Sequence, residues 1–300
     1  MPRSRIFSLI RSAGNRPLPF SNVSSSASAI STYLTPNNSG TTRHPHHFVG
    51  GKWIGIFDFF RIHPQVLDTY EYFWFPDDDI ETSPENAERF LEIVQREKFQ
   101  LAQPALTPDS YYAHHITLAN PAFQFRRTNF VELMLPIMHR DLLLQVLPIF
   151  AGRHFAQGVD YMWHQLTKNP NQDVAIVDLT PMGHRRPRQV HLKGNMSKLH
   201  IDMLEERTRT FAELKIHRQA PMVHSAKFLD GSEVSSKLRL AWELAKGMLW
   251  TNVSISQQPW RPADHLRMSL HQLLSNSNKP TFDPSALKRL QEKKRLRYIS

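Results

Sequence analysis

The chain has 300 residues, 40% of them hydrophobic, which allows one large or two small domains with a real apolar core. It contains no cysteine, which excludes disulfides and cysteine-ligated metals or clusters. No run approaches the ~18 uncharged apolar residues that a transmembrane helix needs. The net charge of +10 favours partners that carry negative charge, such as a phosphorylated substrate or an anionic membrane surface.

Basic residues concentrate at the two ends of the chain, between Arg3 and Arg16 and over residues 288–297. They do not form the stripe of basic and aromatic residues that single-strand binders use, so we expect no nucleic-acid partner. We expect the protein in the cytoplasm, and we hold a peripheral membrane contact through the basic termini as a further expectation.

The first fifty residues carry weak structural signals. Residues 1–28 are rich in Ser, Asn, Pro and Arg, and we expect a poorly ordered tail there, followed by a short strand over 29–34. Gly50-Gly51-Lys52-Trp53 then precedes apolar residues at helical spacing over 54–62, and this helix is expected to break before Pro64. Two glycines before a helix leave backbone N–H groups open to an anion, and Lys52 would add a positive charge.

The most informative stretch follows. Tyr72 to Phe75 is an apolar run ended by Pro76, which predicts a buried strand. Asp77, Asp78 and Asp79 then lie in the turn at the carboxyl end of that strand, where open α/β sheets bind ligands. Adjacent carboxylates repel, so a fold that holds them needs a cation, basic side chains or protons. Oxygen ligands suit Mg²⁺ or Mn²⁺, and the alternative is a solvated acidic turn.

The middle of the chain alternates helices and strands. We predict helices over 84–97, capped by Thr82 or Ser83, and over 140–150, and strands over 101–106, 128–134 and 174–178. Glu132 stands between apolar neighbours and needs a partner or a cavity, because a buried carboxylate is costly. Asp160 follows Gly158 at a predicted helix start, and His184 follows the last of these strands.

The final third of the chain is helical in pattern. We predict helices over 198–216, 236–250, 263–274 and 284–297. In the second of these, Leu238, Ala241, Trp242, Ala245 and Leu249 share one face, which we interpret as core. The predicted organisation is therefore a tail over 1–28, an α/β domain over 29–192 and a helical region over 193–300.

Several ordered blocks carry a family resemblance. They are Gly-Gly-Lys-Trp (50–53), Phe-Pro-Asp-Asp-Asp-Ile-Glu-Thr (75–82), Gln-Pro-Ala-Leu-Thr-Pro-Asp-Ser-Tyr-Tyr (103–112), Thr-Asn-Phe-Val-Glu (128–132), Gly-Val-Asp-Tyr-Met-Trp (158–163) and Thr-Pro-Met-Gly-His-Arg-Arg-Pro (180–187). Together they resemble an uncharacterised bacterial and plant family of the DUF707 type, related to GT-A glycosyltransferases. The resemblance covers a little under half of the chain. It implies a Rossmann-type mixed sheet flanked by helices, with a mostly helical C-terminal extension.

The resemblance also implies an activity: a metal-dependent glycosyltransferase that moves a sugar from a nucleotide-sugar donor to an unknown glycan, lipid or small-molecule acceptor. Its cofactor would be Mn²⁺ or Mg²⁺, held by Asp77, Asp79 and His184. Lys52, Asp77 and Asp78 would bind the donor.

Two further carboxylates would be catalytic by the same resemblance. Asp160 would take the proton of the acceptor hydroxyl if the reaction inverts the anomeric centre, and Glu132 would line the acceptor or sugar pocket.

Two other functions stay open. GT-A folds begin with a strand that grips the nucleoside, and the segment 29–34 matches it poorly, so a non-catalytic carbohydrate- or nucleotide-binding protein that keeps the fold is the second hypothesis. A metal-dependent phosphotransferase or hydrolase that uses the same carboxylates is the third. The sequence has no P-loop, no Gly-x-Ser-x-Gly elbow and no His-Glu-x-x-His pair.

Overall fold

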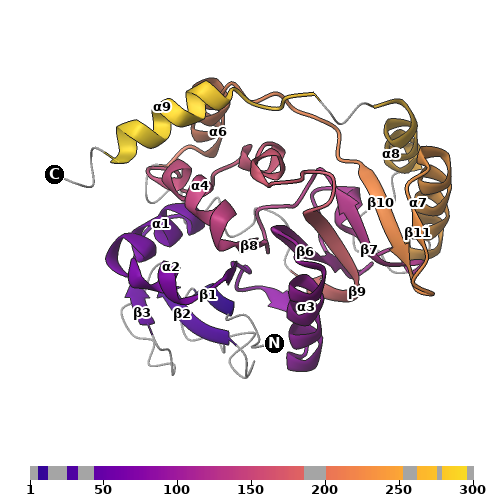
Figure 1. The fold of residues 1–300 in the computed structure, drawn as a ribbon, viewed down its shortest axis with the longest axis horizontal. Helices are drawn as coiled ribbons and strands as arrows, with labels where there is room; N and C mark the ends of the chain where they lie inside the picture. The colour runs from indigo at the N-terminus through magenta and orange to yellow at the C-terminus, as the bar shows by residue number, and fades with distance from the viewer. Residues whose placement is uncertain are drawn as a thin grey trace.

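A mixed β-sheet runs through the molecule, and helices cover both of its faces (Figure 1). The computed structural model describes residues 6–12, 26–32, 44–185, 201–252, 262–275 and 279–295. The basic residues Arg3 and Arg16 and the end of the chain from 296 lie outside the described residues. The mixed α/β fold implied by the resemblance is confirmed.

The sheet orders its strands β11-β10-β7-β9-β6-β8-β4-β1-β2-β3, and β5 pairs with β9 beside this path. Strands β1 to β4 run parallel in pairs, whereas β8 lies antiparallel between β4 and β6. The strand bounds are β1 Ile6–Ser12, β2 Ser26–Thr32, β3 His44–His47, β4 Tyr72–Trp74, β5 Ile80–Glu81, β6 Leu101–Leu106, β7 Phe123–Thr128, β8 Ile137–His139, β9 Val174–His184, β10 Val223–Phe228 and β11 Glu233–Val234.

The helices follow the predicted periodicity closely. Their bounds are α1 Lys52–Ile62, α2 Gln65–Thr69, α3 Pro84–Glu97, α4 Arg140–Phe150, α6 Met203–Leu214, α7 Lys237–Asn252, α8 Pro262–Leu274 and α9 Pro284–Arg295, with short 3₁₀ turns η1 His115–Thr117, η2 Val159–Tyr161 and η3 Trp163–Leu166. Ser83 caps α3 by accepting a hydrogen bond from Asn86 N, as the sequence predicted. The helix expected to begin near Asp160 is instead the pair η2 and η3.

Strand β1 lies inside the segment expected to be a tail. It pairs in parallel with both β4 and β2, and Ile6, Phe7 and Leu9 are buried. The expectation of a poorly ordered tail is therefore wrong for β1. Both faces of the sheet are covered here, so each of these alternating apolar side chains reaches a core. Strand β2 overlaps the strand expected over 29–34 and begins three residues earlier.

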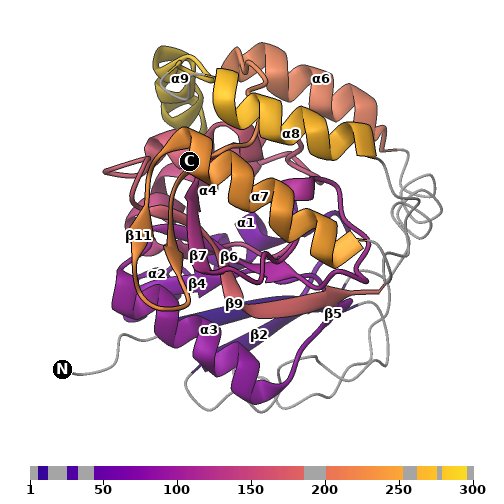
Figure 2. The same cartoon turned by 90° about the vertical axis from the view of Figure 1, so that its right-hand side faces the viewer.

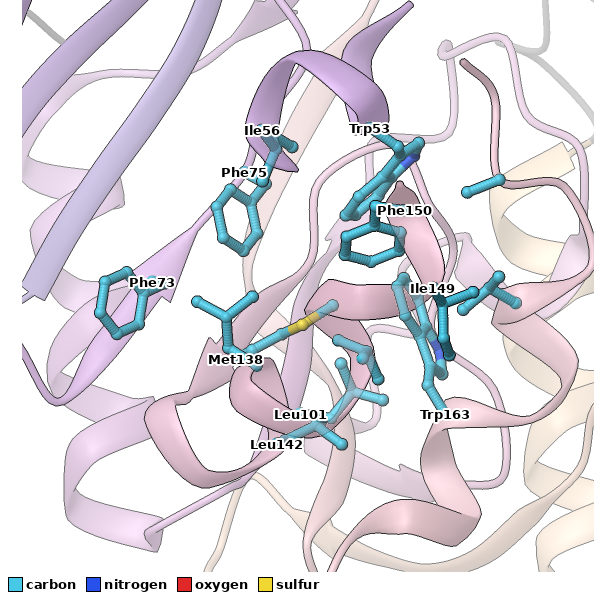
Figure 3. Close-up of a cluster of buried hydrophobic side chains, with 14 of the residues drawn as sticks. Trp53, Ile56, Phe73, Phe75, Leu101, Met138, Leu142, Ile149, Phe150 and Trp163 are labelled. Atoms are coloured by element: carbon cyan, nitrogen blue, oxygen red, sulfur yellow. The ribbon is translucent and has the colours of Figure 1, made fainter. Parts of the chain in front are cut away.

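Side chains of successive residues in the central strands point to opposite faces of the sheet. In β4, Phe73 joins the cluster packed under α1 and α4, whereas Tyr72 and Trp74 join the cluster packed under α3. Figure 3 shows the first cluster, in which Trp53 of α1 lies against Phe150 of α4, with ring centroids 4.4 Å apart. This cluster fixes α1 and α4 on the sheet next to the acidic turn that follows β4.

The C-terminal part of the chain is mostly helical, as predicted, but it also contributes to the sheet. Strand β10 pairs antiparallel with β7, and β11 with β10, so the sheet ends in residues that were expected to lie in a helical region. Helices α7 and α8 pack together, and α6 packs against α9 (Figure 2). Among the described helices, none is both long and apolar enough to cross a membrane.

Helix α7 is rotated relative to the predicted core face. Leu240 and Leu244 are buried with Ala241, but Leu238 is 71% exposed and Trp242 is 66% exposed. The interpretation of this stripe as core is therefore wrong for Leu238 and Trp242. The apolar residues of α7 cover more of its circumference than the sheet can bury, and contact with β10 selects the arc around Leu240 and Leu244.

Candidate functional site

The site is centred on Asp79 and His184, which the sheet brings together across a long stretch of chain. After the turn that follows β4, the short strand β5 pairs antiparallel with the end of β9, and Ile80 lies opposite His184. This register places Asp79 Oδ2 3.3 Å from His184 Nε2. Both side chains are largely buried. The predicted association of the acidic turn with His184 is thus present in the structure.

The imidazole of His184 is oriented by the loop after β6. Its Nδ1 lies 2.6 Å from the carbonyl oxygen of Tyr111, and its backbone N–H donates to Ser110 Oγ. The carbonyl can only accept, so Nδ1 carries a proton and Nε2 is the atom directed at Asp79. Burial lowers the pKa of His184, but the hydrogen bond and charge of Asp79 outweigh it and raise the pKa to about 9.

The pair would supply two ligands to a divalent cation if His184 released its Nε2 proton, because an imidazole that ligates a metal is neutral. In the described parts of the chain, no group of three or more His, Asp or Glu side chains is arranged to hold a metal. Mg²⁺ is commonly bound through one or two protein ligands, with waters and substrate phosphates completing its shell. Two ligands at about 2.1 Å from one ion and at right angles lie about 3 Å apart, close to the separation seen here. A histidine whose other nitrogen is held by a backbone carbonyl is a common metal ligand.

Lys52 and Asp77 form a second pair in the same region. Lys52 Nζ donates to Asp77 Oδ1 at 2.7 Å and to the carbonyl oxygens of Leu133 and Met134 at 2.9 and 2.7 Å. These acceptors use all three donors of the ammonium group, so Lys52 orients Asp77. Burial raises the pKa of Asp77 although 38% of its side chain is exposed, and Lys52 opposes this shift. Asp78 lies half-buried in the same turn.

The N-terminus of α1 is occupied by protein groups, which corrects the expectation of open N–H groups. Gly51 N donates to His154 Nδ1 at 2.9 Å, and Trp53 N donates to the carbonyl oxygen of His154. A Cβ on Gly51 would lie 2.2 Å from that carbonyl oxygen, so this close approach requires glycine. The loop that carries His154 therefore takes the place that we expected an anion to take.

That loop is held from the C-terminal part of the chain by Glu206. The buried carboxylate of Glu206 accepts hydrogen bonds from the backbone N–H groups of His154, Phe155 and Ala156 at 2.6, 2.8 and 2.9 Å. Charge-assisted bonds of this kind are stronger than neutral ones. Helix α6 thus fixes the loop, and the loop fixes Gly51 beside Lys52.

Asp160 is buried in its own turn, with 7% of its surface exposed. Its Oδ1 accepts a hydrogen bond from Gly158 N at 3.2 Å. Burial raises the pKa of Asp160 to about 7, although the backbone N–H groups of Gly158, Asp160 and Tyr161 lower it in part. A carboxyl group with this pKa can gain or lose a proton near neutral pH.

Glu132 is the sequence neighbour of a residue that binds Lys52. It precedes Leu133, whose carbonyl binds Lys52, and its own backbone N–H donates to Gln103 Oε1 at 2.6 Å. The charges of Asp160 and Glu132 both raise the pKa of the Tyr161 hydroxyl, although burial is the larger cause. Asp160 is the sequence neighbour of Tyr161, and Glu132 acts on Tyr161 through its charge. The strand expected over 128–134 does not form: β7 covers Phe123–Thr128 and ends where the predicted strand was to begin, so Glu132 is in a loop.

Some residues that shape the site received no role from the sequence. Ser110 and Tyr111 orient His184, and Arg185 bonds both Glu81 and Asp109, which ties the β5 turn to the loop after β6. Of these, Ser110, Tyr111, Glu81, Asp109 and Arg185 lie within the blocks that carry the resemblance, so a signal for them existed. Glu206 had none, because its three partners are backbone groups.

A surface hollow lies elsewhere, on α3 and the strands beside it, and Arg89, Arg96 and Leu229 are among its lining residues. None of its lining residues belongs to the site described above.

Solved structures resemble this fold at low sequence identity. Glucosyl-3-phosphoglycerate synthase from Mycobacterium tuberculosis, solved with Mn²⁺, UDP-glucose and phosphoglyceric acid, is 10% identical with a TM-score of 0.39, and the match covers 69% of this chain and 80% of that chain. GalNAc-T7, solved with UDP, GalNAc and Mn²⁺, is 9% identical with a TM-score of 0.42, over 70% of this chain and 51% of that chain. Likenesses at this level carry no argument about activity.

The sequence itself assigns the chain to a family. No curated protein matches this chain. Residues 50–226 match the family described as "Protein of unknown function (DUF707)", and this range includes the acidic turn, His184 and Glu206. The match spans more than half of the sequence, and the chain therefore belongs to the DUF707 family.

Proposed function

We propose that the protein is a metal-dependent glycosyltransferase that takes its sugar from a nucleotide-sugar donor. The observation that carries this proposal is the pair Asp79–His184, with His184 Nδ1 held by the Tyr111 carbonyl so that Nε2 faces the carboxylate. A carboxylate and an oriented imidazole at the end of two paired strands are suited to hold a divalent cation that also binds substrate phosphates.

Asp79 and His184 would hold Mn²⁺ or Mg²⁺ in this proposal. When bound, the ion would neutralise the charge that develops on the departing nucleoside diphosphate. The chain's own contribution on this side is orientation: Lys52 holds Asp77 in the same turn, and Tyr111 holds His184. Their partners restrict the rotamers of both side chains, so little ordering remains to be done when the donor binds.

Asp160 would act on the acceptor side. Its pKa of about 7 suits a group that accepts the proton of a hydroxyl as the new bond forms. The turn that holds it is anchored through Gly158 and by the loop that Glu206 caps. Glu132, whose charge acts on Tyr161, would line the sugar or acceptor position.

A thermal-shift panel of UDP, GDP, ADP and CMP, each with and without Mn²⁺, tests the proposal. We expect one nucleotide to stabilise the wild type only with Mn²⁺, by about 2.7 kcal/mol at a hundredfold excess over its dissociation constant. Asp79→Asn and His184→Gln should lose this stabilisation. Asp68→Asn, at an exposed position on α2, is the matched control and should keep it.

Turnover separates the proposal from the second hypothesis. Incubation of the corresponding sugar nucleotide with Mn²⁺ should release the nucleoside diphosphate slowly even without an acceptor, and Asp79→Asn should abolish the release. Nucleotide binding with no release under any condition would favour a non-catalytic binding protein. Mn²⁺-dependent stabilisation that survives in Asp79→Asn and His184→Gln would contradict the site.

A further inference from the structure

Next to Asp160, four aromatic rings and two arginines form a continuous surface, which we call the aromatic–arginine face. Its members are His114, Phe130, Tyr161, Phe211, Arg207 and Arg218. Tyr161 is its centre: its ring centroid lies 6.3 Å from His114, 5.9 Å from Phe130 and 6.3 Å from Phe211. Phe130 is buried, with 1% of its surface exposed, and packs behind the other rings, whereas His114, Tyr161 and Phe211 are each half-buried. The face is therefore open to solvent at those three rings and at the arginines.

Helix α6 is pressed closely against this surface. The ring of Phe211 lies where a Cβ on Gly158 would be, with the nearest ring atom 2.4 Å from that position, and Gly158 has a φ of +101°. Glycine alone tolerates both the contact and the backbone conformation. Phe211 thereby packs against Gly158, which stands two residues before Asp160 in the sequence.

The two arginines lie beside Phe211, one over its ring and one on the same helix. The Arg218 guanidinium lies over the Phe211 ring at 5.5 Å, and Arg207 stands one helical turn before Phe211 on the same side of α6. Both reach the site electrostatically, because Arg218 lowers the pKa of Asp160 and Tyr161, and Arg207 lowers that of Tyr161.

Neither arginine has a carboxylate within ion-pair distance in the described part of the chain. By contrast, Arg126, Arg153 and Arg185 each bind a carboxylate. A guanidinium fork matches the oxygens of a carboxylate or a phosphate group with two parallel hydrogen bonds. Two such forks therefore lie beside Tyr161 and His114, two half-buried rings of the kind that pack against the apolar face of a sugar.

We propose that the aromatic–arginine face binds the acceptor, and that this acceptor carries an acidic group, a carboxylate or a phosphate, which Arg207 and Arg218 bind while Tyr161 and His114 contact its ring. This proposal rests on the proposed function in one respect, namely that Asp160 acts on the acceptor. It goes further by naming the acceptor's chemistry and the residues that would bind it.

Calorimetric titration with three simple probes tests the proposal: glucuronate, glucose 6-phosphate and glucose, each added to the full chain without nucleotide or metal. We expect at least one acidic probe to bind about tenfold or more tightly than glucose. The double variant Arg207→Gln/Arg218→Gln should lose that preference. Comparison of the two acidic probes shows whether the site prefers a carboxylate or a phosphate.

Arg239→Gln is the matched control, because Arg239 lies over Phe228 at 5.1 Å in the same kind of contact on another part of the surface. It should leave binding of all three probes within about twofold of the wild type. No preference for either acid in the wild type would overturn the proposal, and so would equal losses in the control and the double variant.

The nucleotide panel with Mn²⁺ is repeated on the double variant. Retained stabilisation shows that the variant is folded and that the donor side is intact, so a failure of the acceptor proposal stays distinct from a failure at Asp79. Loss of nucleotide binding in the double variant alone would assign the arginines to the donor and would also overturn the proposal.

Discussion

The raised pKa of Asp160 predicts how the free energy of unfolding changes with pH, whatever the substrate is. Its folded pKa of about 7 lies above the ordinary value of 3.8, so the folded state holds a proton that the unfolded state releases. This contribution to stability is fully present below pH ~4 and is lost as pH rises through about 7. A shift of this size corresponds to on the order of 4 kcal/mol.

Asp160→Asn keeps an oxygen for the Gly158 N–H and removes the titrating proton. We expect the variant to gain stability relative to the wild type between pH 5 and pH 8, measured by urea unfolding at both values. Asp68→Asn, which is exposed, should show no such change with pH. A constant difference between Asp160→Asn and the wild type across this range would contradict the assigned pKa.

At the scale of single elements, substitutions on the two faces of α7 can show which face is buried. Leu244→Ala removes a buried side chain next to β10 and should lower the free energy of unfolding by about 2–5 kcal/mol. Trp242→Gln, two residues earlier and 66% exposed, should change it by no more than about 0.5 kcal/mol. Urea unfolding of both variants measures the contrast. A larger loss for Trp242→Gln would restore the core interpretation of that stripe.

The sequence predicted helices and strands correctly where apolar residues recur at a regular spacing. It missed strands in which polar or charged residues interrupt that spacing. The helices α3 and α4 were predicted almost to the residue, because each has a continuous apolar face and α3 also has the Ser83 cap. Strand β1 was missed because its few apolar residues stand in a polar, basic surrounding. Strand β10 was missed because Lys227 and His224 interrupt its apolar residues.

At the scale of the whole molecule, the predicted boundary near residue 192 would cut through shared structure. Beyond it lie β10, which pairs with β7, and Glu206, which caps the loop before Asp160. Phe282 and Leu287 of the C-terminal part also belong to the core cluster under α1 and α4. We infer that the two predicted regions fold as one unit.

A chain that ends at residue 192 should therefore fail to unfold cooperatively. It would expose the β7 edge and leave the three N–H groups that Glu206 caps without their acceptor. Near-ultraviolet circular dichroism would measure the tertiary packing of this fragment, and urea unfolding would measure its cooperativity, each against the full chain. A cooperative transition and a native-like near-ultraviolet spectrum from the fragment would show that the α/β region is independent.

The sequence by itself determined the alternation of strands and helices, the acidic turn after β4, and the position of His184 after a second buried strand. These are consequences of local patterns: an apolar run ended by Pro76, and a second apolar strand that leads to the histidine. Such patterns involve only residues that are adjacent in the chain, so they can be recognised without knowing how distant segments pack.

Only the tertiary structure decided which groups the site residues meet. Lys52 binds Asp77, Gly51 meets His154, and Glu206 caps the loop beside them. The sequence around Gly51 and Lys52 would be the same whether their N–H groups were open to an anion or already bonded to other parts of the protein. The difference is set by contacts between segments far apart in the chain, which form only when the sheet aligns β5 with β9 and α6 packs over the loop.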